Sequence, residues 1–445
     1  MGRRYMAGEG GRYGVPLCSG HMGASVEAIS PLVAERSRRL HCLDAFRGLT
    51  VAAMLVVNNP GTWEHVYAPL RHAPWHGCTP TDLIFPFFLF IVGVSIAFSK
   101  RLGTSGGAGL EFEEGPARVQ LRSGLVRIGK RAATLVLVGL GLNLLSVILR
   151  GDTNLAAWRF PGVLQRIGLC YGIVATAHLL SPAPQPRLGR RRFPLLVEAG
   201  AVLGVLVAYA WILRHVGAPG SGADPLSMEG NIVAWVDRLI LGAGHMYRAG
   251  THDPEGLLST LPAIGTTLIG LWVGRWLRGR SMDSRSAVAA ALMGISLAAC
   301  GLAWTWLPVI GVPLNKELWT SSYVLFTAGC AMIGLGTCIL VWDVWGSRAD
   351  WRPVRTLLHP AETMGRNAMV AFVGSGLAAR ALGAIRIATP AHDGQTVTLG
   401  RWIYERVFTR PEHPELGSLL YALAFLGVWW GVLVVLERKK WYWKV

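Results

Sequence analysis

The chain has 445 residues, of which 52% are hydrophobic and only 16% are charged, and the apolar residues are grouped in long blocks. A helix needs about 20 predominantly apolar residues to cross the hydrocarbon core of a bilayer, and several blocks reach that length with few charges. The composition therefore excludes an ordinary soluble protein and predicts an all-α, polytopic transmembrane helical bundle. The formal net charge of +17 does not indicate nucleic acid as a partner, because Arg and Lys fall mainly between the apolar blocks.

Residues 1–42 are rich in Gly, Arg and Ser and show no apolar periodicity, so we expect a disordered cytoplasmic tail without a signal peptide. The transmembrane domain is expected at 43–445, with about ten helices. Their apolar blocks lie at 43–57, 81–99, 124–149, 162–180, 194–213, 257–277, 287–307, 319–342, 364–382 and 418–436.

Positively charged residues alternate between the loops that join these blocks. The tail, the C-terminal end and the second, fourth, sixth and eighth loops are basic, whereas the odd-numbered loops carry fewer cations and balance them with acids. Cytoplasmic loops carry an excess of Arg and Lys, so this alternation predicts that both ends of the chain lie in the cytoplasm. The ninth loop fits the pattern least well. In this orientation the segments 58–82, 159–166, 253–256 and 313–319 all converge on the non-cytoplasmic face.

The connection between the first two blocks carries three histidines, His65, His72 and His76. The unperturbed pKa of histidine lies close to neutral pH, so an imidazole held beside an amide or a carboxylate is a natural general base. An isolated loop histidine is more often a surface residue. Here Asn58 and Asp82 bracket the connection at one membrane surface, which predicts a catalytic group of His72, Asn58 and Asp82. A simpler role for Asp82 is to cap the second helix.

The sequence does not indicate a metal site. His72 and His76 lie in a Pro-containing loop without helical metal-binding spacing, and no HExxH motif occurs. The seven cysteines include no CxxC pair and mostly lie inside apolar blocks, as small core residues do. The chain also has no GxxxxGK[ST] motif of a soluble nucleotide-binding enzyme.

Other polar residues lie at or near membrane depth. Asp44 and Arg47 are one turn apart at the start of the first helix, where they can form an interfacial ion pair. Gln165 and Arg166 lie about one turn into the fourth helix. Arg166 could brace a neighbouring helix there, or hold a phosphate or pantetheine oxygen.

Two short segments also place charges at helix entries. DPEG at 253–256 could cap the sixth helix, and PLNKELW at 313–319 places Asn315, Lys316 and Glu317 near the interface. Neither segment is specific by composition alone.

Eight motifs occur along the chain in an order that resembles a known family. They are LDAFRGLT (43–50), VNN (57–59), HAPWHG (72–77), TDLIFPFFLFIVG (81–93), FPGVLQRIG (160–168), DPEGLLST (253–260), PLNKELWTSSY (313–323) and GRNA (365–368). Together they resemble the membrane acetyltransferases typified by heparan-α-glucosaminide N-acetyltransferase. The likeness covers nearly all of the chain after the tail.

The resemblance implies an N-acetyltransferase that moves an acetyl group from cytosolic acetyl-CoA to the amine of a glucosamine-type sugar on the extracytoplasmic side. The family's catalytic histidine falls on His72, its asparagine on Asn58 and its helix-entry aspartate on Asp82. Candidates for contacts with acetyl-CoA are Arg47, Arg166, Gln165, Asn315 and Lys316. We expect the chain to lack the amino-terminal luminal region and leading helix of the animal enzyme, and its 58–72 connection is a few residues longer.

Two mechanisms stay open at this point. In one, His72 accepts the acetyl group and passes it on; in the other, which we favour, His72 deprotonates the acceptor amine for direct attack on the thioester. Asn58 would donate a hydrogen bond to the thioester oxyanion, and Asp82 would orient the imidazole.

The alternative function is transport of a sugar or glycan precursor without acyl transfer, because intramembrane charges also mark transporters. The two halves of the chain show no matching motifs, which inverted repeats would produce. We expect acetyl-CoA, an amino-sugar or glycan acceptor and the lipid bilayer as partners, with a homodimer as the assembly. The expected location is the cytoplasmic (inner) membrane of a bacterium, with the active-site loops on the periplasmic side.

Overall fold

The computed structural model describes residues 40–99, 117–149, 151, 157–181, 192–348, 351–388 and 395–443. Residues 1–39 of the expected tail lie outside this described part, as do 100–116 and 182–191 in the basic second and fourth loops. From Leu40 onward the chain forms one compact unit.

Helices make up most of the described chain, which confirms the all-α prediction. The thirteen α-helices within the described residues are α2 (His41–Asn58), α3 (Ile84–Ala97), α4 (Ala117–Leu149), α5 (Val163–Leu180), α6 (Arg192–His215), α7 (Ile232–Leu241), α8 (Leu257–Leu277), α9 (Ser284–Trp304), α10 (Ser321–Cys338), α11 (Arg352–Arg366), α12 (Ala368–Ala384), α13 (Leu399–Ile403) and α14 (Pro414–Arg438). Short 3-10 or π-helical turns lie at η1 (Ala68–Leu70), η2 (Pro80–Leu83), η5 (Ala243–His245), η6 (Tyr247–Gly250), η7 (Ile339–Trp345) and η10 (Tyr404–Phe408). Strands β1 (Arg386–Ala388) and β2 (Thr396–Thr398) pair antiparallel and add a small hairpin to the helices.

Eight helical segments within the described residues are long and apolar enough to cross a membrane. They are Pro80–Ala97, Leu121–Leu149, Val163–Leu180, Val197–His215, Leu257–Leu277, Ser284–Trp304, Ser321–Trp345 and Pro414–Arg438. These segments correspond to eight of the ten predicted blocks. The other two blocks form α2, which carries Asp44 and Arg47 in its first half, and α12, which has only 17 residues. The count of ten spans and the placement of both ends in the cytoplasm stay predictions.

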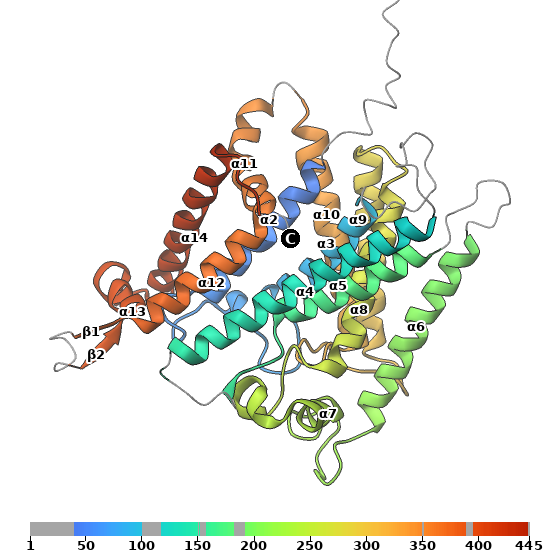
Figure 1. Cartoon of the computed structure of the whole chain (residues 1–445), viewed down its shortest axis with the longest axis horizontal. Helices are drawn as coiled ribbons and strands as arrows, with labels where there is room; N and C mark the ends of the chain where they lie inside the picture. Colours follow the sequence, from blue (N-terminus) through green and yellow to red (C-terminus); the bar gives the residue numbers. More distant parts are fainter. Residues whose placement is uncertain are drawn as a thin grey trace, which may run out of the picture. The chain divides into compact units, whose positions relative to one another are not determined.

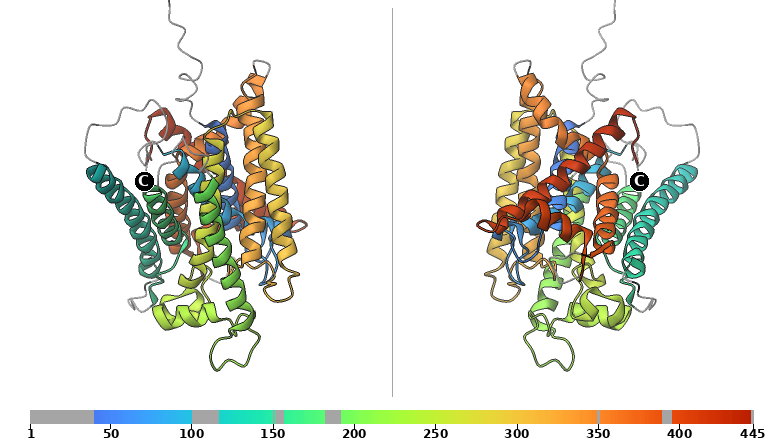
Figure 2. Two further views of the ribbon diagram at one scale, coloured as in Figure 1. Left: turned by 90° about the vertical axis from the view of Figure 1, so that its right-hand side faces the viewer. Right: turned by 90° about the vertical axis from the view of Figure 1, so that its left-hand side faces the viewer.

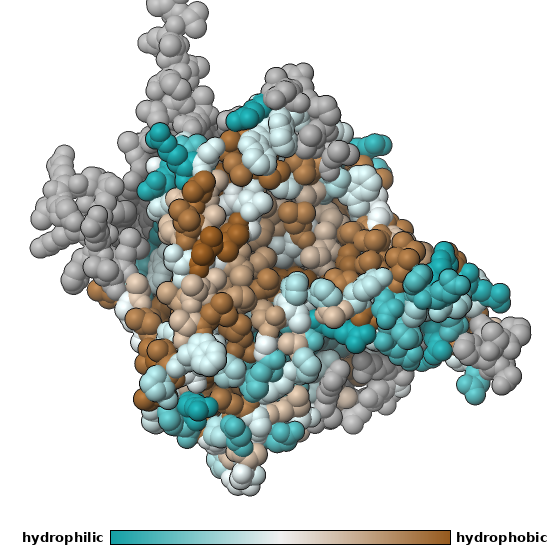
Figure 3. Space-filling view, turned by 180° about the vertical axis from the view of Figure 1, so that it is seen from behind, coloured by the Kyte–Doolittle hydropathy of each residue, from teal (hydrophilic) through white to brown (hydrophobic). Residues whose placement is uncertain are grey.

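The surface of the bundle is suited to a bilayer. Figure 3 shows hydrophobic side chains over the middle of one face and hydrophilic ones gathered toward its rims. Leu137 in α4, Leu292 in α9 and Val428 in α14 are 66%, 59% and 66% exposed. Contact of such a surface with water would cost roughly 25 cal/mol for each Å² of apolar area, a cost that lipid removes. The protein is therefore an integral membrane protein.

The helices pack in pairs, α3 against α8, α9 against α10, α2 against α11 and α4 against α5 (Figures 1 and 2). Glycines bring the backbones of α3 and α8 together. A Cβ atom at Gly93 would lie 2.0 Å from the carbonyl oxygen of Thr267, and one at Gly270 would lie 2.2 Å from that of Phe90. Because only glycine permits this separation, α3 and α8 form a tightly packed support for the loop that precedes α3.

One end of the bundle collects the loops that the sequence analysis singled out. We call it the loop end: α2 ends there, and α3, α5, α8 and α10 begin there. The backbone N–H of Gly77 donates to the carbonyl oxygen of Leu314 at 2.7 Å, and the N–H of Phe160 donates to that of His245 at 3.0 Å. These bonds confirm that loops far apart in the sequence converge on one face. Helix α7 lies at this end, in the lower part of both views in Figure 2.

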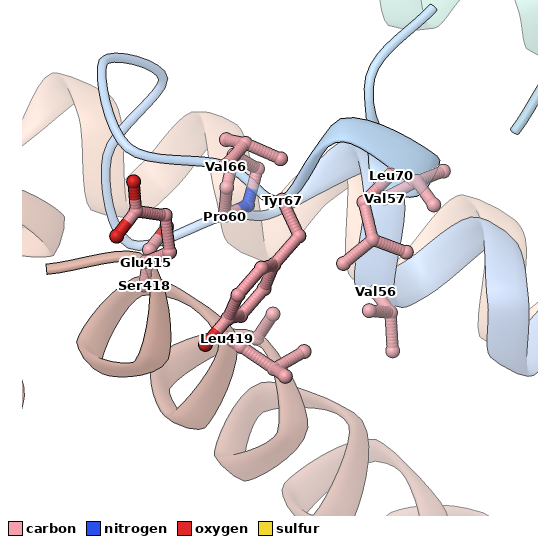
Figure 4. A pocket seen from close by; sticks show the side chains of 10 residues that line it. Val56, Val57, Pro60, Val66, Tyr67, Leu70, Glu415, Ser418 and Leu419 are labelled. Atoms are coloured by element: carbon pink, nitrogen blue, oxygen red, sulfur yellow. The ribbon is translucent and has the colours of Figure 1, made fainter. Parts of the chain in front are cut away.

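Helix α14 contacts the connection between α2 and α3 that carries His65, His72 and His76, which we call the histidine loop. The N–H of Gly61 donates to the carbonyl oxygen of Ser418 at 3.2 Å, and the Ser418 hydroxyl donates to the carbonyl oxygen of Thr62 at 3.1 Å. Figure 4 shows Tyr67 pointing toward the first turns of α14, in a cleft of about 10 Å³. A cleft of this size holds no more than a water molecule, so it is a packing contact and not a substrate site.

Candidate active site

Asp82 is the anchor of the histidine loop. Its Oδ2 accepts hydrogen bonds from the backbone N–H of Thr79, from the Thr79 hydroxyl and from the backbone N–H of Ala73, each at 3.0 Å. The Tyr323 hydroxyl donates to its carbonyl oxygen at 2.5 Å. Asp82 thus caps η2 in a reciprocal capping box with Thr79, as its simpler role predicts. The side chain is 1% exposed, so this cap also fixes a carboxylate beneath the loop.

The same carboxylate holds His72. The His72 Nδ1 lies 2.6 Å from Asp82 Oδ1, and the His72 side chain is 46% exposed. The Lys316 Nζ lies 3.3 Å from His72 Nδ1 and 3.8 Å from Asp82 Oδ1. Nδ1 cannot both donate to Asp82 and accept from Lys316, and the shorter contact favours Nδ1–H donating to the carboxylate. The proton on Nδ1 leaves Nε2 with a free lone pair, so His72 is arranged as a base.

A strained turn positions Lys316. Asn315 Oδ1 accepts a hydrogen bond from the backbone N–H of Leu318 at 2.8 Å, which closes the turn. Trp319 follows with a φ of 50°, a left-handed conformation that a bulky residue rarely adopts. Its indole is fully buried and donates from Nε1 to the Thr266 hydroxyl at 3.2 Å. Packing of the indole therefore holds the turn in place against its backbone strain.

The histidine loop docks directly on this turn. The Asn315 amide nitrogen lies 3.2 Å from His76 Nδ1, and the Gly77 N–H reaches the carbonyl oxygen of Leu314. Asn315 therefore ties two loops together within the protein. This is a structural role for a residue that the sequence analysis assigned to acetyl-CoA binding.

A second histidine and carboxylate meet at the same turn. The His252 Nε2 lies 3.2 Å from Glu317 Oε2, and the Trp75 ring packs edge-on against His252, with ring centroids 5.3 Å apart. Burial alone would raise the pKa of Glu317, but the hydrogen bond from His252 and the positive charge of Lys316 lower it below its usual value. The sequence analysis did not identify His252. Its only signal was its position immediately before the DPEG motif.

The 159–166 and 253–256 segments are joined by charge. The Arg159 guanidinium makes two hydrogen bonds to Asp253, at 2.9 and 2.6 Å, and pairs with Glu255 as well. The cap of α8 comes from α7, because the backbone N–H of Leu257 donates to Asp237 Oδ1 at 2.8 Å. The DPEG motif therefore connects two loops. The predicted role of capping α8 belongs to Asp237 and not to the DPEG motif.

Gln165 and Arg166 line a mostly apolar cavity of about 380 Å³. Arg166 is 1% exposed and donates from Nη2 to the carbonyl oxygen of Gly256 at 2.9 Å and to the Ser259 hydroxyl at 2.5 Å. Its guanidinium lies 5.1 Å from the centroid of the Trp319 ring. Among the described residues, its Nε and Nη1 have no hydrogen-bond partner. Arg166 thus braces helices, as one interpretation predicted, and its Nε and Nη1 border the cavity without a partner among the described residues.

Two candidates have no hydrogen bond to this group among the described residues. Asn58 ends α2 with an exposed side chain, and the described residues offer it no recorded hydrogen bond. Arg47 donates to Asp44 at 3.3 Å, which confirms the predicted ion pair, and to the Ser95 hydroxyl at 3.0 Å. Arg47 precedes Asn58 by three helical turns, or roughly 16 Å of helix. It therefore lies away from the loop end.

The site as described can move protons and donate hydrogen bonds. Its members come from the histidine loop, the 313–320 turn and the residue before the DPEG motif, and they are His72, Asp82, Lys316, Glu317 and His252. Within the described parts of the chain, no three His, Cys, Asp or Glu side chains are grouped as metal ligands.

Comparison with known proteins supports the predicted relationship. Residues 39–185 match the family described as heparan-alpha-glucosaminide N-acetyltransferase, catalytic. The human protein named heparan-alpha-glucosaminide N-acetyltransferase is 28% identical over 342 residues, which cover 69% of this chain and 49% of the human one. The mouse protein of the same name is 25% identical over 445 residues, covering 92% of this chain and 61% of the mouse one. The chain thus spans about half to three fifths of the curated relatives that it matches.

Proposed function

Because the chain is a distant homologue within the family of the heparan-alpha-glucosaminide N-acetyltransferase catalytic domain, we propose that it transfers acetyl from acetyl-CoA to the amine of a glucosamine-type sugar. The observation that carries this proposal is the pair of His72 and Asp82, 2.6 Å apart, with the imidazole exposed and the carboxylate buried. A histidine in this state is a general base that a substrate can reach. The family match includes both residues.

The chemistry follows from the tautomer of His72. The acceptor amine attacks the thioester carbonyl carbon and passes a proton to His72 Nε2 as the C–N bond forms. When the C–S bond breaks, His72 returns that proton to the sulfur of CoA. Asp82 stays ionised throughout and stabilises the imidazolium through Nδ1–H. Direct transfer needs no covalent intermediate on the protein, so we prefer it to an acetyl-histidine.

Two donors suit the oxyanion of this reaction. The Asn58 amide stands exposed at the end of α2, and Lys316 places a cation beside the imidazole. A donor aimed at the developing oxyanion is worth about 3 kcal/mol in comparable reactions. We assign that role to Asn58. Lys316 instead offsets the charge of Asp82, to which it lies within 3.8 Å.

The cavity beside Arg166 suits the pantetheine arm of the donor. Its walls are apolar, and the two unpartnered N–H groups of Arg166 could satisfy an amide carbonyl oxygen. Gln165 lines the same cavity. Arg47 lies toward the other end of α2, where the nucleotide end of acetyl-CoA would enter from the cytoplasm. In this arrangement Asn315 does not contact acetyl-CoA; it affects acetyl-CoA binding only by holding together the two loops that it joins.

We further propose that the protein works in the inner membrane of a bacterium, with the loop end on the periplasmic side. The support is the alternating bias of Arg and Lys between loops. The predicted homodimer is tested by the mass of the detergent-solubilised protein. Neither proposal affects the chemistry at His72.

The direct test is acetyl-CoA-dependent acetylation of glucosamine by the purified protein in detergent. We expect His72→Ala to fold normally and to lose roughly 10² to 10⁴ in turnover, the usual worth of a positioned proton acceptor. His65→Ala is the matched control, because it alters the same loop without touching Asp82 or Asn315; His76→Ala would also remove the contact with Asn315. A folded His72→Ala protein with near wild-type turnover would exclude this mechanism.

A further inference from the structure

Two pairs of histidine and carboxylate share the turn that carries Lys316 and Glu317. Lys316 contacts His72 at 3.3 Å, and the next residue, Glu317, contacts His252 at 3.2 Å. Trp75 closes the arrangement from the histidine loop. It lies three residues after His72, and its ring packs against His252. The second pair is therefore a neighbour of the proposed base.

The two carboxylates at this turn have different partners. The Lys316 Nζ lies 3.8 Å from Asp82 Oδ1, so the lysine cation is paired with the buried carboxylate. Within the described residues, the side chain that pairs with Glu317 is His252. An ionised carboxylate attracts a cationic ligand.

Glu317 is the carboxylate that a ligand can reach. Its side chain is 17% exposed, whereas that of Asp82 is 1% exposed. His252 holds Oε2, and within the described residues no hydrogen bond is recorded to Oε1. Trp75 in turn limits the positions open to the His252 ring, and Trp75 Nε1 is fixed on the carbonyl oxygen of Leu226 at 2.8 Å. The Glu317 carboxylate is thus held in place while its Oε1 can accept a hydrogen bond from a ligand.

We propose that Glu317 binds the ammonium group of the acceptor and so selects amines over alcohols at this site, with His252 as its positioning residue. This inference rests on the proposed function. Before attack, the bound ammonium releases one proton to solvent at the exposed side of Glu317. The resulting amine forms the C–N bond, and its second proton passes through His72 Nε2 to the CoA sulfur as the C–S bond breaks. One thiol and one solvent proton result, which balances the reaction.

His72 alone would not select the amino group of a sugar over its hydroxyl groups. His72 could deprotonate a hydroxyl as well as an amine, and a sugar presents several hydroxyls beside one amino group. A carboxylate next to the base favours the cationic group by a charge-assisted hydrogen bond. Loss of that bond should weaken binding by about 10- to 100-fold.

The test compares glucosamine with glucose, in which a hydroxyl replaces the amino group. Equilibrium binding of both sugars to the detergent-purified protein is measured by calorimetry, together with KM and kcat for glucosamine. For Glu317→Gln we expect a KM and a dissociation constant for glucosamine that are about 10- to 100-fold higher, with affinity for glucose unchanged. The KM for acetyl-CoA should stay within about threefold of wild type. Glu317→Asp should recover part of the discrimination.

The control is Glu229→Gln, which removes an exposed carboxylate from the loop between α6 and α7. It should leave the discrimination between the two sugars unchanged. Equal losses for glucosamine and glucose in Glu317→Gln would mean a structural role and would overturn the inference, as would wild-type protein that binds both sugars equally. If wild type binds glucosamine preferentially but does not acetylate it, the proposed function fails and the ammonium site stands.

Discussion

Asp82→Asn is the sharpest perturbation of the catalytic pair, because it changes one atom and keeps the shape of the side chain. Three donors converge on Oδ2, the backbone N–H groups of Ala73 and Thr79 and the Thr79 hydroxyl, whereas Oδ1 faces His72 Nδ1. In the variant the amide oxygen must stay on the side of the three donors. The amide nitrogen then faces Nδ1, which has to become an acceptor. The proton moves to Nε2, and His72 loses the lone pair that receives the substrate proton.

The magnitude follows from this exchange of tautomers. A wrong tautomer in a comparable pair of carboxylate and histidine costs about 10⁴ in turnover, so we expect a loss of roughly 10³ to 10⁴ here. All four hydrogen bonds can form, the one to Nδ1 with its direction reversed, and only the charge of the carboxylate is lost, so stability should fall by only about 1–2 kcal/mol. Initial rates of CoA release at varied glucosamine give kcat and KM separately. Thermal melting in detergent confirms the fold.

A matched comparison makes the result decisive. The double variant that combines Asp82→Asn with His72→Ala should be no slower than either single variant, because the two residues act as one unit. Folded Asp82→Asn protein that keeps more than about a tenth of wild-type kcat would refute the tautomer argument, whose expected loss is at least a hundred times larger.

The remaining predictions concern a buried acid, the orientation and the donor. Burial raises the pKa of Asp237 to about 6, so the protonated carboxyl contributes its full stability below about pH 4 and this contribution is lost as the pH rises through 6. Asp237→Asn keeps the oxygen that caps α8, and at pH 8 its free energy of unfolding should exceed that of wild type by roughly 3 kcal/mol, with a higher melting temperature. The variant's melting temperature should also depend less on pH between 4 and 7. In a cysteine-depleted background, Gly279→Cys should label from the cytoplasm and Glu229→Cys from outside; labelling of both from one side would contradict the predicted topology. Arg166→Gln should raise the KM for acetyl-CoA several-fold. Arg47→Gln should raise the same KM if the nucleotide end of acetyl-CoA binds near Arg47. An unchanged KM for acetyl-CoA in both variants would exclude both residues from the donor site.

The sequence predicted the parts of the site that lie within one stretch of chain. His72 and Asp82 are ten positions apart, and Thr79 with Asp82 forms a helix-entry signal that is visible as a pattern of residue types. The apolar blocks predicted the helices for the same reason, since length and composition are local properties. Eight of those blocks are candidate spans.

Contacts between distant segments could not be predicted in this way. Lys316 lies 244 positions from His72, and Glu317 lies 65 positions from His252, so only the folded bundle brings them together. The partners of a charge at membrane depth are equally non-local. The Arg47 guanidinium contacts Asp44, one turn away, but also the Ser95 hydroxyl of another helix. Composition identifies a costly charge but not every partner that satisfies it.

His72 and Asp82 differ in exposure, so the base is accessible to a substrate while its partner is held rigidly. His72 has to meet a substrate, and its side chain is 46% exposed, whereas Asp82 has to keep one orientation and is 1% exposed. The rigid partners belong to helix entries that are packed against α8 and α10. Trp319 has a strained backbone that costs of order 1–3 kcal/mol, and burial of its indole together with the hydrogen bond to Thr266 holds it in place. Loosening that indole would displace the Lys316–Glu317 turn, and with it the charge that we assign to acceptor binding. Because the histidine loop docks on the same turn through Leu314 and Asn315, the position of the base depends on Trp319 as well.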